Sequence, residues 1–452
     1  MLTEANLYPF QRKIIDRMLK QPKIGCFLDL GMGKTICCLT TIARLIKAGE
    51  ARSALVVTPK SVTWGWRQEA ERWEHTRDLR ISIISGDARK RLENARKTAD
   101  LYIVSRDNFA WLSEARTNAD DCDILVLDES TSFKNRGTKR WKSLCLKGRR
   151  KHRWLDDFRR IIELTGTPAS ESLLGLWAQM YILDRGERLY PTLTAFRERY
   201  MVPDIIKGRP IYNRFKSGAE AEIKEKIKDI CIAMEAKDYL ELPERIDIIR
   251  YTDYTKDRLY KQMQTDGVTE IDGQHIMAVD GATRYNKLRQ IASGFIYDEL
   301  GEAHHIHDKK EEALEELLEE TANENVLIFY QYEYERQYLT DRFHGEPLDT
   351  PEQQARWNNG EIKTAIAHPA SLGYGCNIQF GGRTVIWLTL PLSYEQYKQS
   401  NGRLYRQGQR NTVKIIHIIS AGTIEEKIYK LLKEEKADLL NRLMEAMKKE
   451  EI

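Results

Sequence analysis

Short and nearly continuous apolar runs recur through the first third of the chain and alternate with segments whose apolar positions follow a helical period. Thr35 to Lys47 and Trp64 to Trp73 are two such helical segments. Apolar runs without alternation are typical of strands covered on both faces, as in a parallel sheet with helices on each side. The runs are Ile24 to Leu28, Ala54 to Val57, Ile81 to Ile84, Leu101 to Val104, Ile124 to Leu127 and Ile161 to Leu164. This part of the chain is predicted to form a doubly wound α/β lobe.

A second series of strands follows after a break. From Asp184 to about Leu240 the apolar runs fade, and charged, helix-favouring sequence such as Ala219 to Asp238 predicts a helical insertion or linker. The later runs are Val326 to Tyr330, Thr364 to Ala367, Thr384 to Leu388 and Val413 to Ile419. They predict a second α/β lobe. Thr423 to Glu450 has apolar positions at helical spacing, which predicts an amphipathic helix at the C-terminus.

The length of 452 residues favours more than one domain, because single hydrophobic cores stop growing well below this size. We therefore predict an α/β protein with two doubly wound, parallel-sheet lobes and a helical insertion. The three parts are an N-terminal lobe over residues 1–184, the insertion or linker over 185–240, and a C-terminal lobe with its terminal helix over 241–452.

Composition narrows the class of protein. Hydrophobic residues make up 41% and charged residues 31%, which is typical of a globular enzyme and not of a disordered chain. No apolar run approaches the length that crosses a bilayer, and the opening residues MLTEANLYPFQRK lack the apolar segment of a secretory signal. The seven cysteines form no CxxC pair, so neither a disulfide framework nor a zinc site is indicated. A protein of a reducing, cytoplasmic compartment is expected.

Positive charge is concentrated in one segment, although the net charge of the chain is only +4. Basic residues crowd the segment from Lys134 to Arg160, where Asp156 and Asp157 are the acidic residues. Such a run is typical of a track that binds phosphates, and equally of a solvated basic loop. Both interpretations stay open at this point.

A glycine-rich segment, DLGMGKT from Asp29 to Thr35, follows a predicted buried strand and opens a predicted helix. Glycines allow backbone N–H groups to turn toward a polyphosphate, Lys34 can reach its outer phosphates, and Thr35 can hold Mg²⁺. The residues expected to contact the nucleotide are Gly31, Met32, Gly33, Lys34 and Thr35. The general pattern has a further glycine where this chain has Leu28, so a chance glycine-rich turn is the alternative.

Two adjacent carboxylates, Asp128 and Glu129, end the predicted strand Ile124 to Leu127. Asp128 can bind Mg²⁺, and Glu129 can orient and deprotonate the attacking water, because phosphoryl transfer needs positioning and charge neutralisation. A solvated turn or helix cap explains the pair in isolation. The order of the pair after Lys34 and Thr35 favours the catalytic interpretation.

Two arginines stand in the string QYKQSNGRLYRQGQR near the C-terminus, Arg403 and Arg406. At a spacing of three they are predicted to share one helix face. Guanidinium groups stabilise the charge on a transferring phosphoryl group, so they are candidate arginine fingers from the second lobe. The alternative is a basic helix that binds the phosphates of a nucleic acid.

The order of these segments resembles that of superfamily-two helicases, and within them the Swi/Snf-type ATPases, including compact versions found in bacteriophages. The resemblance covers nearly the whole chain and implies two RecA-like lobes. The segments that carry it are Tyr8 to Gln11, Asp29 to Thr35, Leu55 to Lys60, Asp128-Glu129, Leu164 to Pro168, Leu327 to Phe329, His368 to Gln379 and Gln399 to Gln409.

The resemblance implies further roles. Gln11 is the expected adenine contact, ATP with Mg²⁺ the expected cofactor, and DNA the expected partner. Residues of three motifs, Lys60, Thr167 and Ser371, are expected to contact the sugar-phosphate backbone, which carries no base sequence. Trp64, Trp66 and Trp73 lie within a helical pattern, so packing is favoured over stacking on bases.

Two residues differ from the family pattern, and these differences bear on the coupling between motifs. Thr131 and Tyr405 each stand at a position where many relatives have histidine. Neither change removes a group expected to bind Mg²⁺ or phosphate. The function that follows is an ATP-dependent DNA translocase or helicase acting on duplex DNA, in a bacterial or phage-infected cytoplasm. The alternatives are a strand-separating helicase and a non-motor protein that ATP switches between DNA-binding states.

Overall fold

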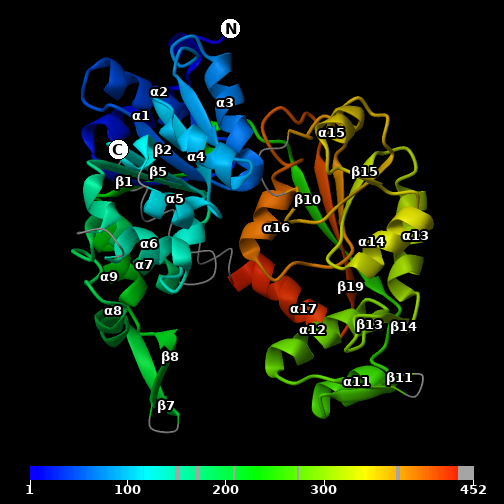
Figure 1. Cartoon of the computed structure of the whole chain (residues 1–452). Coiled ribbons are helices and arrows are strands. Elements are labelled where there is room, and N and C mark those ends of the chain that lie inside the picture. The colour runs from blue at the N-terminus through cyan, green and yellow to red at the C-terminus, as the bar shows by residue number, and fades with distance from the viewer. Residues whose placement is uncertain are drawn as a thin grey trace. The chain divides into compact units, whose positions relative to one another are not determined.

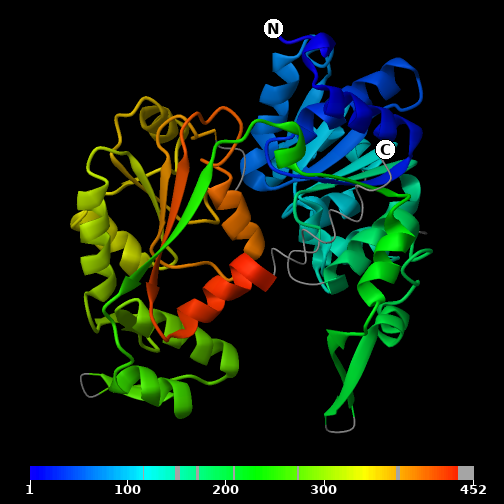
Figure 2. The same ribbon diagram turned by 180° about the vertical axis from the view of Figure 1, so that it is seen from behind.

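The structure, a computed structural model, divides the chain into two compact units, and the division falls between Leu240 and Glu241. Each unit is built around a parallel sheet with helices packed on its faces (Figures 1 and 2). The residues that the structure describes are 1–115, 117–147, 153–168, 173–206, 209–271, 274–372 and 377–435. In these residues, no helix is both long and apolar enough to span a bilayer.

The sheet of the first unit has seven parallel strands in the order β3-β4-β2-β5-β6-β1-β9. Most of its strands are buried along their whole length, as continuous apolar runs require. The strands are β1 (Lys23–Leu28), β2 (Ala54–Thr58), β3 (Ile81–Ile84), β4 (Leu101–Ser105), β5 (Ile124–Asp128), β6 (Arg160–Thr165) and β9 (Cys231–Met234). All six runs that the sequence singled out in this unit are strands, so the predicted doubly wound lobe is confirmed.

Helices cover both faces of this sheet and connect its strands. In chain order they are α1 (Pro9–Lys20), α2 (Lys34–Lys47), α3 (Thr63–Arg72), α4 (Ala88–Arg96), α5 (Phe109–Ala115), α6 (Lys139–Cys145), α7 (Leu173–Asp184), α8 (Leu193–Tyr200), α9 (Ala219–Ile227) and α10 (Ala236–Tyr239). The basic run Lys134 to Arg160 therefore includes α6 and the start of β6, while residues 148–152 lie outside the described residues. Arg159 and Arg160 of this run form ion pairs with Asp123 and Glu50.

The segment predicted as a helical insertion or linker, residues 185–240, contains strands as well as helices. An antiparallel hairpin of β7 (Met201–Ile206) and β8 (Arg209–Phe215) extends away from the rest of its unit in both views (Figures 1 and 2). The predicted helix Ala219 to Asp238 stops at Ile227, because the buried strand β9 pairs with β1. Four apolar residues inside charged sequence are too short a signal for periodicity to separate strand from helix.

The second unit holds a six-stranded parallel sheet in the order β10-β19-β18-β15-β17-β16. Its core gathers apolar residues of strands and helices around Leu314, Ile328, Ile386 and Ile416. The strands are β10 (Arg245–Thr252), β15 (Val326–Phe329), β16 (Glu346–Pro347), β17 (Thr364–Ala367), β18 (Thr384–Trp387) and β19 (Val413–Ser420). The second predicted lobe is confirmed, although the edge strands β10 and β16 carried no apolar run that predicted them.

Helices and two small hairpins complete the second unit. The hairpins pair β11 (Val268–Ile271) with β12 (Gln274–Met277), and β13 (Phe295–Tyr297) with β14 (Ala303–His305). The helices are α11 (Arg258–Thr265), α12 (Gly281–Ala292), α13 (Lys309–Glu320), α14 (Glu333–Asp341), α15 (Pro351–Asn358), α16 (Tyr394–Asn401) and α17 (Ile424–Lys430). The predicted C-terminal helix begins as α17 and continues as a π-helical turn, Leu431–Glu435, after which the prediction falls outside the described residues.

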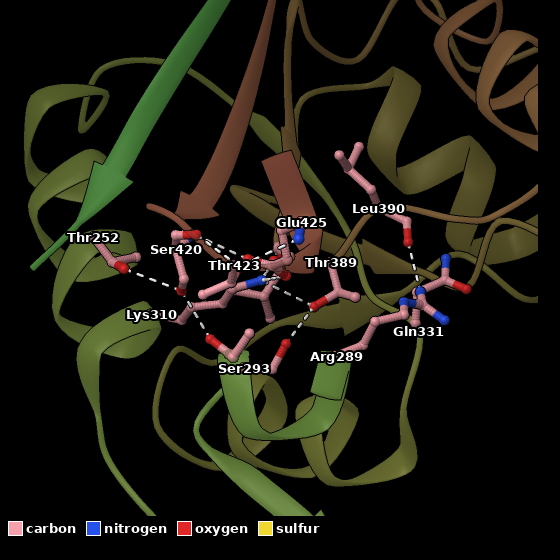
Figure 3. A network of polar contacts seen from close by, with 12 residues as sticks. Thr252, Arg289, Ser293, Lys310, Gln331, Thr389, Leu390, Ser420, Thr423 and Glu425 are labelled. Carbon is pink, nitrogen blue, oxygen red and sulfur yellow. Dashed lines mark hydrogen bonds and ion pairs between the residues drawn. The ribbon is translucent and has the colours of Figure 1, made fainter. Parts of the chain in front are cut away.

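A buried polar network fastens several of these helices at the carboxyl ends of β18 and β19 (Figure 3). Lys310 of α13 is fully buried, and its Nζ donates to Oε1 of Glu425 on α17 at 2.5 Å and to Oγ1 of Thr389 at 3.2 Å. The Thr389 hydroxyl donates in turn to Oε1 of Glu335 on α14. Each charged group is therefore paired or hydrogen-bonded, as buried charges must be.

Candidate functional site

The loop from Asp29 to Gly33 joins the buried strand β1 to the first turn of α2. Gly31 and Gly33 have φ angles of +80° and +74°, in the left-handed region that glycine adopts at no steric cost. A Cβ at Gly33 would also lie 2.3 Å from Nε2 of Gln11, so the Gln11 amide would have to move to make room for it. The loop thus presents backbone N–H groups at a helix N-terminus, which is a favourable place for a phosphate.

Gln11 packs directly against this loop. Its side chain is buried, its Nε2 donates to the Met32 carbonyl at 3.3 Å, and its Oε1 accepts from the Tyr8 amide at 3.0 Å. The amide is therefore oriented by groups at both ends. The structure brings Gln11, Met32 and Gly33 together, as expected for parts of one nucleotide site.

Lys34 and Thr35 open α2, and both are half-buried. Nζ of Lys34 donates to the Leu28 carbonyl at 3.1 Å, at the end of β1. The turn after β6 lies beside this amine, because a Cβ at Gly166 would stand 3.6 Å from Nζ of Lys34 and 3.2 Å from the Leu28 oxygen. A side chain at position 166 would be tight against the Leu28 carbonyl, which is the group that accepts from the lysine amine.

Asp128 is the last residue of β5, and its carboxylate is held by two donors. Its Oδ2 accepts a hydrogen bond from Oγ1 of Thr58 at 2.9 Å and another from Nε1 of Trp66 at 2.9 Å. Thr58 ends the neighbouring strand β2, and Trp66 lies on α3 with its ring fully buried. The carboxylate is 8% exposed and fixed in orientation, which suits a ligand of a hard cation.

Glu129 follows Asp128 in a strained backbone conformation. Its φ and ψ angles are 51° and 61°, in the left-handed region, and the residue is 7% exposed. A non-glycine residue in this region costs of order 1–3 kcal/mol, and such strain gathers at functional sites. The short 3₁₀ helix η4 (Ser130–Phe133) begins immediately afterwards and carries the chain away from the sheet.

The cysteines beside the site are packing residues. Burial raises the pKa of the Cys37 thiol to about 12. Burial also raises the pKa of the Cys38 thiol well above its usual range, and the charge of Asp128 adds to the effect. Both thiols are therefore neutral and poor nucleophiles at pH 7.

The two candidate arginines lie beyond the end of a helix, which corrects the prediction that they share a helix face. The helix α16 ends at Asn401, and Gly402 follows as its C-cap. Asn and Gly favour helix ends, so the chain continues in turns through Arg403 and Arg406. Nη1 of Arg406 donates to Oδ1 of Asn377 at 2.9 Å.

The surroundings of Arg406 are electrostatically unusual. Burial lowers the pKa of this guanidinium to about 10, and the positive charge of Arg403 contributes further. Arg403 itself is only 8% exposed. Two neighbouring cations, one buried and one half-buried, repel each other, and an anion placed against them would relieve that repulsion. The pair therefore suits a phosphate.

The three expected backbone contacts lie just after strands of the two sheets. Lys60 is exposed and follows β2, whereas Thr167 follows β6 and is only 2% exposed. Ser371 follows β17, is exposed, and its hydroxyl donates to the His368 carbonyl at 2.9 Å. In the second unit Ser371 and His368 line a cavity of about 480 Å³, in which burial keeps the pKa of His368 below its usual value.

A separate group of possible metal ligands lies in the second unit. His305, Asp308 and Glu311 bring one ligand atom each within 4.8 Å of one another. The Glu311 carboxylate already forms an ion pair with Arg342 at 2.7 Å, and His305 contacts Asp308 at 2.7 Å. Both carboxylates of the group therefore already have side-chain partners.

Thr58 and Trp66 are site residues that sequence reasoning missed. Trp66 was expected to be a packing residue, and it does pack, but its N–H also fixes Asp128. The Thr58–Asp128 contact follows from adjacent strands, because β2 and β5 are neighbours that end at the same edge of the sheet. A threonine at the end of a strand is too common a feature to reveal this in one sequence.

Comparison with known proteins places these features in context. Residues 10–294 match the family model of the SNF2-related domain. Protein p41 of Acyrthosiphon pisum secondary endosymbiont phage 1 is 32% identical over 98% of this chain and 98% of its own. YwqA of Bacillus subtilis, named as a candidate ATP-dependent helicase/translocase, is 25% identical over 98% of this chain but 49% of its own length. A solved SWI2/SNF2 ATPase core of Sulfolobus solfataricus in complex with dsDNA is 22% identical, covers 98% of this chain and 94% of that chain, and has a TM-score of 0.44.

Proposed function

Because the chain belongs to the SNF2-related family, whose members are DNA-dependent ATPases of helicase superfamily two, we propose that it moves along duplex DNA at the expense of ATP. The observation that carries the proposal is the arrangement at one edge of the first sheet. There the Lys34 amine lies beside the Gly166 turn, and Asp128 is clamped by Thr58 and Trp66. A loop suited to a phosphate and an oriented carboxylate on a rigid frame support the proposal.

ATP and Mg²⁺ fit the donors of this edge. The loop glycines Gly31 and Gly33 have the backbone conformation that a phosphate-binding loop needs, and Lys34 supplies a cation for the outer phosphates. Thr35 and Asp128 offer hydroxyl and carboxylate oxygen, which are the ligands that Mg²⁺ prefers. When bound, Mg²⁺ supplies charge neutralisation on the phosphates. Gln11, already oriented against the loop, is the proposed adenine contact.

Hydrolysis is assigned to a base in the first unit and to cations in the second. Glu129 is held in a strained backbone next to Asp128, and we assign it the role of orienting and deprotonating water. Arg403 is buried, Arg406 is half-buried, and their positive charges repel each other, so we assign them the stabilisation of the transferring phosphoryl group. Because these groups lie in different units, hydrolysis would require the two lobes to close on the nucleotide.

Movement along DNA then requires contacts with the DNA backbone that change with the state of the bound nucleotide. Lys60, Thr167 and Ser371 are the proposed phosphate-backbone contacts, two in the first unit and one in the second. Lys60 and Ser371 are exposed, while Thr167 is buried and would contact DNA only after a local rearrangement. Contacts of this kind read no base sequence, so sequence-independent binding is expected. The proposal places the protein in the cytoplasm of a bacterium, with or without phage infection.

Steady-state ATP hydrolysis with and without nucleic acid tests the proposal. Purified protein is assayed alone and with duplex DNA, single-stranded DNA and RNA, with Lys34→Ala as the inactive control. Strong stimulation by duplex DNA supports a duplex translocase. A preference for single strands would instead support a strand-separating helicase. An absence of hydrolysis under every condition would overturn the proposal in favour of an ATP-switched binding protein.

A further inference from the structure

Gln179 of α7 has a fully buried side chain whose amide is used at both ends. Its Oε1 accepts a hydrogen bond from the Ser130 hydroxyl at 3.0 Å. Its Nε2 donates to the Pro168 carbonyl at 2.7 Å and to the Gly175 carbonyl at 3.2 Å. The side chain therefore has one defined orientation, and it joins two turns that are distant in the sequence.

Both of these turns belong to the site described above. Ser130 directly follows Glu129, so its position bears on the strained backbone of that residue. Pro168 ends the turn after β6, in which Gly166 lies beside the amine of Lys34. Gln179 is thus the link between the carboxylate turn and the turn that contains the proposed DNA contact Thr167.

Burial of a glutamine at this place is not explained by packing. An uncharged amide costs free energy to bury unless its polar atoms are paired, and an apolar side chain would fill a helix–sheet contact without that cost. The rest of α7 follows this rule, because its buried residues are mostly apolar, including Leu176, Met180 and Leu183. The glutamine is the exception at the position that faces Ser130 and Pro168.

We propose that Gln179 is a positioning residue that transmits the state of the Thr165–Pro168 turn to Glu129. When nucleic acid displaces this turn, Pro168 moves the amide of Gln179, and the amide moves Ser130 and with it the carboxylate that orients water. Hydrolysis is then fast only when the turn is engaged. The inference rests on the proposed function, since it assigns a cause to the stimulation of hydrolysis by DNA.

Gln179→Met tests the inference, because methionine has a similar volume and neither donates nor accepts strongly. We expect the ratio of DNA-stimulated to unstimulated kcat to fall about tenfold, equivalent to about 1.4 kcal/mol in the barrier. We expect the KM for ATP to stay within about twofold, because no group that binds the nucleotide is changed. A purely structural role would lower the melting temperature without changing this ratio.

Gln290→Met is the matched control. Gln290 is also a buried helical glutamine, on α12 of the second unit, and its Oε1 accepts from the Tyr297 amide at 3.1 Å. It belongs to the second unit, whereas the turns that we invoke belong to the first. The control is expected to lose some thermal stability and to keep the wild-type stimulation ratio.

Ser130→Ala provides a second variant in case Gln179→Met folds poorly. It removes the donor to Gln179 while leaving α7 unchanged, and we expect a similar loss of stimulation. If both residues act through one hydrogen bond, the double variant should lose no more than the worse single variant. Losses that simply multiply would contradict a shared link.

The outcomes distinguish a failure of the coupling role of Gln179 from a failure of the proposed function. A wild-type protein that DNA stimulates, with a Gln179→Met ratio equal to that of Gln290→Met, would overturn the coupling role and leave the translocase proposal intact. A wild-type protein that no nucleic acid stimulates would overturn the proposed function, and the coupling role with it. A selective loss of stimulation in Gln179→Met supports both.

Discussion

The indole N–H of Trp66 donates to the carboxylate of Asp128 across 2.9 Å, although the two residues are separated by 62 positions in the chain. The donor is on α3 and the acceptor ends β5, so helix and sheet packing together determine where the carboxylate points. Outer-shell hydrogen bonds of this kind orient metal ligands and raise metal affinity. The contact makes a buried tryptophan part of the proposed Mg²⁺ site.

Trp66→Phe should therefore weaken the response to Mg²⁺. The ring volume is largely kept, one of the two donors to Asp128 is lost, and the concentration of Mg²⁺ that gives half-maximal hydrolysis should rise ~10–100-fold. Trp154→Phe is the control, because Trp154 is equally buried in the same unit and stacks on Phe109. An equal shift in both variants, or none in Trp66→Phe, would contradict the role of this contact.

Arg406→Ala should abolish hydrolysis and leave nucleotide binding largely intact. An arginine that stabilises a transferring phosphoryl group contributes about a thousandfold or more to kcat. Binding is measured with a fluorescent ATP analogue, and turnover by phosphate release. Arg356→Ala serves as the control, since Arg356 lies on the surface of the same unit in ion pairs with Glu346 and Glu361. A fully active Arg406→Ala protein would refute the assignment.

The local features of the site were predictable, and the contacts that organise it were not. Gly33, Lys34 and Thr35 form one short pattern whose residue types indicate phosphate and Mg²⁺ binding. Asp128 follows an apolar run that predicts a strand. Trp66 and Gln179 act on residues 62 and 49 positions away, and the identity of their partners depends on which strands become neighbours. A single sequence contains no signal for that.

The fold shows the same division between strong and weak local signals. Central strands such as β5 were recognised because both faces are buried and the four residues before its terminal Asp128 are all apolar. The edge strand β10 mixes exposed and half-buried residues, so its periodicity is poor. The failure at Arg403 and Arg406 has a similar cause, because spacing alone does not reveal that a helix has ended at Asn401.

Lys310→Ala should destabilise the second unit strongly. The change leaves Glu425 buried without its cation, and breaking a buried ion pair from one side costs about 3–5 kcal/mol. The neighbouring Lys309 is exposed and pairs with Glu312, so Lys309→Ala should change stability by less than about 1 kcal/mol. Thermal unfolding of both variants distinguishes them, and equal melting temperatures would contradict the importance of the network in Figure 3.

His417 should make stability depend on pH below neutrality. The ring is fully buried, its Nδ1 lies 3.1 Å from the Ile248 carbonyl and its Nε2 lies 2.9 Å from the Tyr397 hydroxyl. The carbonyl can only accept, so the neutral ring donates from Nδ1 and accepts from Tyr397. Burial lowers the pKa of His417 to about 4.

The sign of the effect follows from which state binds the proton. Between about pH 6.5 and pH 4 the unfolded chain is protonated at His417 and the folded chain is not, so stability is lost as the pH falls. The loss approaches about 3 kcal/mol at the lower end. The melting temperature of the His417→Gln variant should fall less between pH 7.5 and pH 5 than that of the wild-type protein. An identical fall would show that other groups dominate in this window.

The most direct test of the central claim is displacement of a third strand from a DNA triplex. A motor that moves along duplex DNA removes the third strand without separating the duplex, and it needs ATP to do so. We predict displacement by the wild-type protein with ATP, and none without ATP or by Glu129→Gln, which should still bind DNA. Robust DNA-stimulated hydrolysis without displacement, or separation of the duplex itself, would contradict translocation on duplex DNA.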